Sequence, residues 1–252
     1  MKFKTMSVHS GQRIDPQTGA LTTPLYQSST FSYFNAQAGK ERFAGQAPGF
    51  IYSRFGNPTT AELEQKLAAL EGADEALVVA SGMAAVSAIM YALADSGDEV
   101  AYIGPLYGGT DAFLKQTFSR AGIKITAYES DQALLANIRP ATKVVLFETL
   151  TNPTLKVVDP RVVVEAARKV GAITVCDNTF LTPYLLRPLE LGIDIVMHSG
   201  TKYLGGHGDI IAGVVAGRHE LMKSIRTVAL KHIGSPIGPQ EAYLLQRGVK
   251  TL

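Results

Sequence analysis

From residue 59 onward, short apolar runs alternate with amphipathic stretches, and this alternation constrains the fold more than any other feature of the chain. The runs are rich in Val and Ile and lack a polar residue at every second position, which is typical of strands covered on both faces. Strands are expected at 76–80, 99–103, 124–128, 143–147, 173–176 and 193–198, with a further candidate at 210–216. Helices are expected between them at 84–93, 110–121 and 160–170. This order predicts an α/β fold with a mostly parallel sheet and helices on both faces.

Residues 1–58 differ from the rest of the chain because they show weak periodicity and contain four prolines among many Ser, Thr, Gln and Gly residues. This composition predicts an irregular N-terminal arm. The globular domain is expected to begin at residue 59 with a helix over 61–70. Thr59 or Thr60 is the expected N-cap of this helix, and Gly72 follows its end.

Composition excludes several classes of protein. The chain has 252 residues, 46% of them hydrophobic, which suffices for one sizeable core, and a formal net charge of +2 gives no reason to expect a nucleic acid or an anionic membrane as partner. The longest uncharged run, 76–94, is interrupted by Ser81-Gly82, so we expect a buried strand and a buried helix and not a membrane span. The single cysteine, Cys176, can form neither an internal disulfide nor a metal-ligand cluster, so we expect no metal and a reducing, cytoplasmic location.

Polar residues follow five of the expected strands. The segments are Ser81-Gly82-Met83, 105–110, 148–153, Asp177-Asn178-Thr179 and 199–202. In an open parallel sheet, ligands bind beyond the carboxyl ends of the strands. The sequence therefore predicts one site at that edge, built from all five segments.

The segment Ser81-Gly82-Met83 opens a helix directly from a strand. Gly82 permits close approach of the backbone, and the free N–H groups of a first helical turn suit a phosphate. A tight strand–helix turn without a ligand is the alternative. Neither G-x-G-x-x-G nor G-x-x-x-x-G-K-[ST] occurs, so a dinucleotide or nucleoside triphosphate is not supported.

The segment Ser199-Gly200-Thr201-Lys202 places two hydroxyls and an amine at another strand end. A desolvated lysine has a lowered pKa and attacks carbonyl groups, and the hydroxyls suit a phosphate beside it. Asp177 suits a protonated ring nitrogen, and Tyr107 suits a flat ring on which to stack. The alternatives are a solvated surface lysine, an aspartate that caps a turn and an ordinary rim tyrosine. Taken together, these groups describe a site for pyridoxal 5'-phosphate.

At these residues the chain resembles a known family, the pyridoxal-phosphate enzymes of cysteine and methionine metabolism. The motifs are Y-S-R-F-G-N-P-T from Tyr52, A-S-G-M-A-A from Ala80, L-Y-G-G-T from Leu106, D-N-T-F from Asp177 and H-S-G-T-K-Y from His198. The family includes methionine and cystathionine gamma-lyases, cystathionine gamma-synthase, cystathionine beta-lyase and acyl-homoserine sulfhydrylases. The resemblance implies the large domain of a fold type I, PLP-dependent transferase-like protein with a seven-stranded sheet over 59–252.

The resemblance also implies a role for each motif residue. Lys202 would form the Schiff base with the cofactor and move the alpha proton, Asp177 would hold the pyridine nitrogen protonated, and Asn152 would lie near the ring hydroxyl. Tyr107 would stack on the ring, and Tyr107 and Tyr52 join Lys202 as the expected catalytic residues. The phosphate would be bound by Ser81, Gly82, Met83, Ser199 and Thr201. Tyr52 and Arg54 would reach the phosphate of a neighbouring subunit, so a homodimer at least, and commonly a tetramer, is implied.

The implied reaction is the gamma-elimination of a sulfur group from an amino acid such as methionine, cystathionine or homocysteine, which gives a 2-oxo acid, ammonia and a thiol. Two alternatives stay open, namely gamma-replacement by a synthase or sulfhydrylase, and a fragment that binds the cofactor without catalysis. Gly109 and His232 differ from the residues typical of strict methionine gamma-lyases. Family chains are longer, so the resemblance implies that a small C-terminal domain is absent here, together with the arginine that binds the substrate carboxylate.

Overall fold

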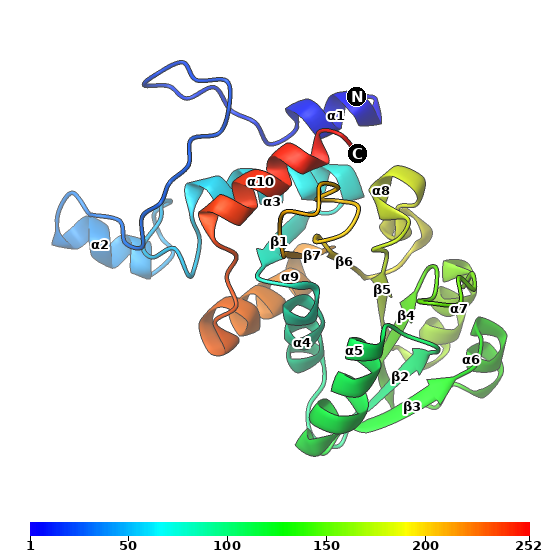
Figure 1. Cartoon of the computed structure of the whole chain (residues 1–252). Coiled ribbons are helices and arrows are strands. Elements are labelled where there is room, and N and C mark those ends of the chain that lie inside the picture. The colour runs from blue at the N-terminus through cyan, green and yellow to red at the C-terminus, as the bar shows by residue number, and fades with distance from the viewer.

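A seven-stranded sheet forms the centre of the computed structural model, which describes residues 1–252 (Figure 1). The strands are β1 (Glu75–Val79), β2 (Glu99–Ile103), β3 (Lys124–Tyr128), β4 (Thr142–Glu148), β5 (Ile173–Asp177), β6 (Ile195–Ser199) and β7 (Gly213–Gly217). They are hydrogen-bonded in the order β1-β7-β6-β5-β4-β2-β3. Only β7 runs antiparallel to its neighbours. The predicted mostly parallel sheet is confirmed, and the candidate at 210–216 forms the shorter strand β7, which begins three residues later and ends one residue later than expected.

Both faces of the sheet are buried, and the alternation of side chains along each strand supplies both cores. In β1, Ala76 and Val78 belong to one hydrophobic cluster, whereas Leu77 and Val79 belong to the other. The first cluster is covered by α3 (Pro58–Glu71), α6 (Asp131–Asn137), α7 (Pro160–Val170) and α10 (Pro239–Val249). The second is covered by α4 (Gly82–Leu93), α9 (His219–Arg226), and the π-helix η4 (Thr227–Ile233). Helices therefore lie on both faces, as predicted.

The first long helix of the domain, α3, begins earlier than predicted. Asn57 is its N-cap: the Asn57 side chain accepts the N–H of Thr59, and the Thr60 hydroxyl accepts the N–H of Asn57 in return. Pro58 occupies the first helical position, where the missing N–H costs nothing. The expected caps Thr59 and Thr60 therefore lie inside the helix, whereas Gly72 ends it in the left-handed conformation as predicted.

The segment 110–121 is not the single helix that its apolar spacing predicted. It divides into α5 (Gly108–Ala112), a π-helical turn η1 (Phe113–Thr117) and a 3-10 turn η2 (Phe118–Ala121). The π-turn brings Phe113 and Phe118 into a stacked contact at 5.5 Å, and Phe118 also packs edge-on against Tyr91 of α4. Packing of these aromatic rings against α4 accompanies the change of helical period.

The N-terminal arm contains two helices, α1 (Phe3–His9) and α2 (Ala36–Phe43), so it is less irregular than predicted. Helix α1 lies against α3, where the buried ammonium of Lys66 donates to the carbonyl oxygens of Ser7 and Val8 at 2.9 Å each. The segment between α1 and α2 loops away from the sheet (Figure 1).

The uncharged run 76–94 forms most of β1 and then α4, as predicted. No helix of the chain combines the length and the apolar character that crossing a membrane requires.

Three short or terminal elements complete the fold. They are α8 (Thr182–Leu185), the 3-10 turn η3 (Pro188–Leu191) and the end of α10, where Lys250 caps the helix after Val249.

Candidate active site

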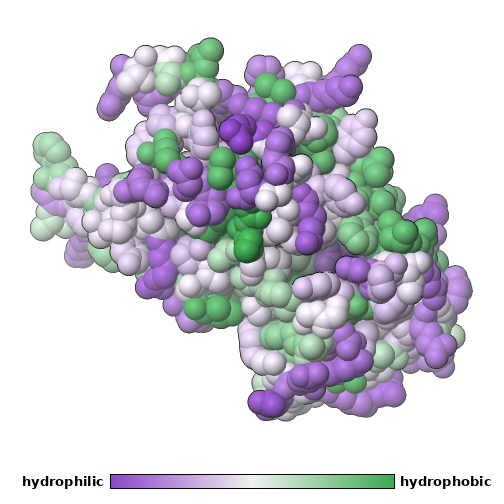
Figure 2. All heavy atoms as spheres, viewed as in Figure 1, coloured by the Kyte–Doolittle hydropathy of each residue, from purple (hydrophilic) through white to green (hydrophobic).

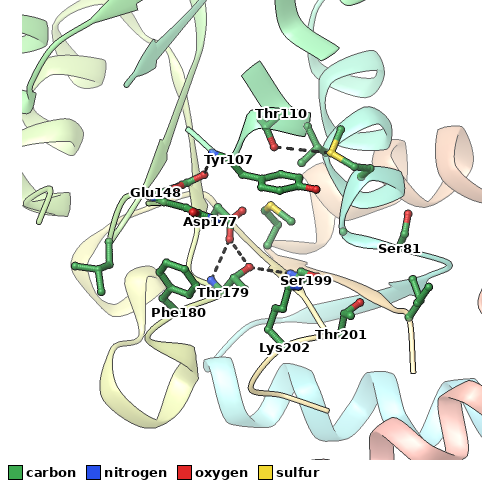
Figure 3. A pocket seen from close by; sticks show the side chains of 17 residues that line it. Ser81, Tyr107, Thr110, Glu148, Asp177, Thr179, Phe180, Ser199, Thr201 and Lys202 are labelled. Carbon is green, nitrogen blue, oxygen red and sulfur yellow. Dashed lines mark hydrogen bonds between the residues drawn. The ribbon is translucent and has the colours of Figure 1, made fainter. Parts of the chain in front are cut away.

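A cavity of about 280 Å³ lies at the carboxyl ends of the parallel strands (Figure 3). All five polar segments singled out in the sequence contribute to it. Its lining residues are Ser81, Gly82, Met83, Val86, Tyr107, Thr110, Glu148, Leu150, Asn152, Asp177, Thr179, Phe180, Met197, Ser199, Thr201, Lys202 and Ile211. The five segments therefore converge on one cavity, as predicted, and its role as a ligand site stays a prediction.

Strand register explains why the polar groups meet. Glu148 ends β4 directly opposite Asp177, which ends β5, and Asp177 pairs in turn with Met197 of β6. On the other side of β6, Ser199 lies opposite Gly213, the first residue of β7, and Gly213 also pairs with Val79 of β1. Sequence-distant residues are therefore neighbours because their strands end at the same level.

The segment Ser81-Gly82-Met83 forms the first turn of α4 and provides a cup for an anion. The Ser81 side chain caps the helix by accepting the N–H of Ala84 at 3.1 Å. The N–H groups of Gly82 and Met83 have no intrahelical acceptor and carry the positive end of the helix dipole. A Cβ on Gly82 would lie 3.0 Å from the Cβ of Ser199, so glycine lets the two walls of the cup approach each other.

Asp177 is held so that one of its oxygens stays available. Its Oδ1 accepts both the N–H of Thr179 at 3.0 Å and the Thr179 hydroxyl at 2.5 Å, whereas Oδ2 accepts no hydrogen bond from the chain. The same Thr179 hydroxyl accepts the N–H of Ser199 at 2.8 Å and so joins β5 to β6 (Figure 3). Burial raises the pKa of Asp177 above its ordinary value. A cation at Oδ2 would oppose this effect and favour the carboxylate.

Lys202 lies in the loop after β6 and lines the cavity, but it is exposed to solvent. Its backbone N–H donates to the carbonyl of Ser199 at 3.2 Å, and its ammonium takes part in no ion pair. The desolvation expected from its position at a buried strand end is therefore not present in this chain. The amine is instead free to reach a ligand in the cavity.

Tyr107 lines the cavity, and its ring lies beside Asp177 (Figure 3). Half of its surface is exposed, and its backbone precedes the first turn of α5. Gly109, in that turn, leaves room for the ring, because a Cβ there would lie 2.5 Å from Cε1 of Tyr107. Thr110, which the sequence reasoning did not assign, contacts Met83 across the same wall at 3.9 Å.

Glu148 was in a predicted rim segment, but the sequence reasoning gave it no role. In the structure it is buried, and its two carboxylate oxygens accept the N–H of Tyr107 at 2.5 Å and the N–H of Asn152 at 2.8 Å. Desolvation raises the pKa of Glu148 to about 7, and the neighbouring charge of Asp177 acts in the same direction. The sequence did contain a signal for this residue, because Glu148 is a carboxylate placed directly at the end of a buried strand.

Tyr52 and Arg54 do not line this cavity. Tyr52 is exposed and forms an isolated β-bridge with Thr30 in the arm. The Arg54 guanidinium donates to the carbonyls of Leu230 and Lys231 in η4 and lies over the Phe55 ring at 4.5 Å. Nine of the eleven predicted site residues therefore lie together, and these two lie elsewhere in the chain.

The donors and acceptors of the cavity fit pyridoxal 5'-phosphate. Free amides and hydroxyls suit the phosphate, the free oxygen of Asp177 suits a protonated ring nitrogen, the Tyr107 ring suits a flat ligand, and Lys202 supplies an amine. The sequence of residues 4–252 matches the family described as Cys/Met metabolism PLP-dependent enzyme.

Proteins with known names are similar over almost the whole chain. The L-methionine gamma-lyase of Porphyromonas gingivalis is 44% identical over 254 residues, which cover 99% of this chain and 63% of that protein. The cystathionine gamma-lyase of Bacillus subtilis is 42% identical over 255 residues, which cover 100% of this chain and 65% of that protein. The chain thus spans slightly less than two thirds of the length of these relatives.

Solved structures agree with these similarities. A putative O-acetylhomoserine (thiol)-lyase from Campylobacter jejuni, whose structure contains a lysine carrying pyridoxyl phosphate, superposes with a TM-score of 0.93 at 32% identity, covering 100% of this chain and 71% of that one. The cystathionine gamma-lyase of Lactobacillus plantarum, complexed with L-serine, gives a TM-score of 0.91 at 37% identity, covering 100% of this chain and 64% of that one. This chain has the fold of these fold type I enzymes and belongs to the family of PLP-dependent enzymes of cysteine and methionine metabolism.

Proposed function

We propose that this chain binds pyridoxal 5'-phosphate and forms the cofactor-binding part of a carbon–sulfur lyase of sulfur amino-acid metabolism. One observation carries the proposal: the cavity brings Lys202, the free oxygen of Asp177 and the anion cup at Gly82 to one edge of the sheet. These groups match an aldehyde, a basic ring nitrogen and a phosphate, respectively.

The proposed roles follow the geometry. Ser199 and Thr201 on β6 and its loop, together with the first turn of α4, hold the phosphate. Asp177 keeps a ring nitrogen protonated, the Tyr107 ring covers a flat ligand and Asn152 lies beside it. Lys202 holds the cofactor and, once the substrate amine has replaced it, takes up the proton from the substrate alpha carbon.

The bound cofactor supplies an electrophilic carbon for the substrate amine and accepts the electron pair left when the alpha proton is removed. Lys202 then carries that proton, and its exposed amine has the freedom to move between the alpha and beta positions of a substrate. Loss of a gamma sulfur group after removal of a beta proton releases a thiol, and hydrolysis gives a 2-oxo acid and ammonia. The names of the two gamma-lyase relatives favour methionine or cystathionine-type substrates.

Gamma-replacement is a second candidate. It is favoured by the C. jejuni structure, described as that of a putative O-acetylhomoserine (thiol)-lyase, which superposes on the whole of this chain. In that reaction the gamma acyloxy group would leave as a carboxylate, a thiol would add to the gamma carbon, and the product would be released as an amino acid without loss of ammonia. A chain that binds the cofactor without turnover is the third candidate.

A second copy of the chain is the proposed partner. Several large hydrophobic side chains of the arm are exposed, among them Ile14, Leu21, Phe34 and Phe43, and Figure 2 shows hydrophobic residues at the outer end of the arm near α2. We propose that this surface packs on a second subunit and that Tyr52 and Arg54 reach its phosphate group. A cytoplasmic location remains a prediction that rests on the single, buried cysteine.

The test of cofactor binding uses the chain as it is. The protein is incubated with pyridoxal 5'-phosphate, its absorbance spectrum is recorded, and the adduct is reduced with borohydride and located by peptide mass spectrometry. We expect a yellow species and a modified Lys202, both lost in Lys202→Ala and both retained in Lys231→Ala. A native chain that gives no coloured species, or a modification spread over surface lysines, would refute the proposal.

Product analysis separates the candidate reactions. The loaded protein is supplied with methionine, cystathionine, cysteine or an O-acyl-homoserine plus a thiol. A 2-oxo acid with a thiol indicates elimination, and a thioether from the acyl-homoserine indicates replacement. Cofactor bound at Lys202 without either product would favour a binding role for this chain.

A further inference from the structure

Glu148 connects two loops that line the cavity. It is the last residue of β4, and only 5% of its surface is exposed. One oxygen accepts the N–H of Tyr107, in the loop between β2 and α5, at 2.5 Å. The other accepts the N–H of Asn152, in the loop after β4, at 2.8 Å. One side chain therefore binds the backbone of both residues.

The two loops have no other direct hydrogen bond to each other. The loop before Tyr107 is tied to β3 through the N–H of Gly104, which donates to the carbonyl of Tyr128 at 2.9 Å. The loop at Asn152 closes on itself, since the N–H of Thr151 donates to the carbonyl of Lys156 at 3.0 Å. The two loops follow the paired strands β2 and β4, and beyond that pairing the Glu148 carboxylate is the group that hydrogen-bonds both of them.

Packing alone does not fix the two side chains. The Tyr107 ring is 51% exposed, and Asn152 is only partly buried. The backbone at each residue must supply the rigidity that a contact surface needs, because an exposed side chain on a mobile loop loses more conformational entropy when a ligand orders it.

We propose that Glu148 is a positioning residue whose carboxylate fixes Tyr107 and Asn152 relative to each other and so sets the width of the cofactor cavity. Above its raised pKa of about 7, Glu148 is an ionised carboxylate that only accepts hydrogen bonds, so it satisfies two N–H groups at once, and the exchange measurements below are made in that pH range. A glutamine of nearly the same shape can accept one of them, and its amide group would face the other N–H donor to donor. The consequence for cofactor affinity rests on the proposed function, whereas the effect on the two loops does not.

A purely structural role for Glu148 is distinguishable from this one. If the carboxylate only stabilised the end of β4, its replacement would lower overall stability and loosen the sheet without singling out two loops. A matched control is available in Glu64 of α3. Its Oε1 likewise accepts a backbone N–H, that of Val78 at 3.1 Å, and its Oε2 pairs with Arg226 at 3.0 Å, so Glu64→Gln also weakens contacts of a buried carboxylate, but outside the cavity.

The experiment measures amide hydrogen exchange at Tyr107 and Asn152 in the cofactor-free protein, by NMR or on peptides that cover residues 104–113 and 149–158. Glu148→Gln is compared with the native chain and with Glu64→Gln, and pyridoxal 5'-phosphate affinity is measured on the same samples. Loss of a hydrogen bond to a charged acceptor should speed exchange by about tenfold to a hundredfold. We expect this at one or both amides in Glu148→Gln and at both in Glu148→Ala, with weaker cofactor binding. Glu64→Gln should leave both amides and the affinity unchanged.

Unchanged exchange at both amides in Glu148→Gln would overturn the proposal. So would the same increase in Glu64→Gln, or faster exchange with cofactor affinity equal to that of the native chain. If Glu148→Ala does not fold, amide exchange in the isosteric variant Glu148→Gln decides whether the carboxylate holds the two loops. If the native chain itself fails to bind the cofactor, the proposed function fails, and the exchange measurement still decides whether Glu148 holds the two loops.

Discussion

A methyl group at Gly109 would collide with the ring of Tyr107. The Cβ of an alanine there would lie 2.5 Å from Cε1 and 3.2 Å from Cζ of that ring, and 3.3 Å from the sulfur of Met83. Carbon atoms make favourable contact at about 3.5–4.0 Å, so the ring has to move by about 1 Å or more. Because the ring is half exposed, it can move without disturbing the core.

The expected consequence is a loss of affinity without a loss of stability. A displaced ring forfeits stacking on a flat ligand, which is worth about 0.5–1.5 kcal/mol, so Gly109→Ala should bind pyridoxal 5'-phosphate about twofold to tenfold more weakly. Replacement of a helical glycine by alanine stabilises by about 0.5–1 kcal/mol, which offsets the contact. The free energy of unfolding should therefore stay equal or rise slightly.

Gly108→Ala is the matched control, because it adds the same methyl group to the same turn of α5 and meets no atom within 4 Å. Affinity is measured by titration of the cofactor absorbance, and stability by urea denaturation of the cofactor-free chains. The reasoning is refuted if Gly109→Ala binds as tightly as the native chain, or if Gly108→Ala weakens binding to the same extent.

Three further predictions concern stability. Glu148, whose pKa is raised to about 7, binds a proton in the folded state at pH values where the unfolded chain has lost it, so the free energy of unfolding should fall as pH rises from about 4.5 to 7. Glu148→Gln should reduce this slope in urea titrations, and an unchanged slope would contradict the assignment. Burial lowers the pKa of Lys66 to about 8, so between pH 8 and 10 the unfolded chain binds a proton at Lys66 that the folded chain does not. The free energy of unfolding of the native chain, compared with that of Lys66→Met, should therefore rise in this range by at most about 1.4 kcal/mol per pH unit. An equal pH dependence of the two proteins would contradict this. Asn57→Ala removes the N-cap of α3 and should lower the free energy of unfolding by about 1–2 kcal/mol in denaturant titrations, whereas no change would show that the cap is replaced.

The arrangement of strands and the location of the site could be predicted from the sequence because both depend on short-range patterns. Runs of Val and Ile without polar alternation indicate strands buried on both faces, and the parallel order places the residues after each strand at one edge of the sheet. Ser81, Asp177 and Lys202 could therefore be assigned to one site from the sequence. The residue types at these strand ends also pointed to pyridoxal 5'-phosphate, and motif resemblance added the family and named Asn152, whose type alone would not have singled it out.

Other features depended on contacts between distant segments. The break of 110–121 into three helical types accompanies packing of Phe113 and Phe118 against α4, and α1 is joined to α3 by hydrogen bonds from the ammonium of Lys66. Neither contact can be predicted from local helix propensity. The sequence therefore predicted one regular helix over 110–121 and an irregular arm over 1–58. Tyr52 and Arg54 lie outside this chain's own cavity, and their expected contact with the phosphate of a neighbouring subunit stays a prediction.

The sequence by itself determined the α/β architecture, the edge of the sheet that carries the site and most of the polar residues that line it, since periodicity and strand ends are local properties. Only the tertiary structure decided which groups touch. It placed Glu148 beside Asp177 through strand register, joined Tyr107 and Asn152 to one carboxylate, and left Lys202 exposed where burial was expected. Hydrogen-bond partners and solvation are set by residues far apart in the chain, and no local pattern records them.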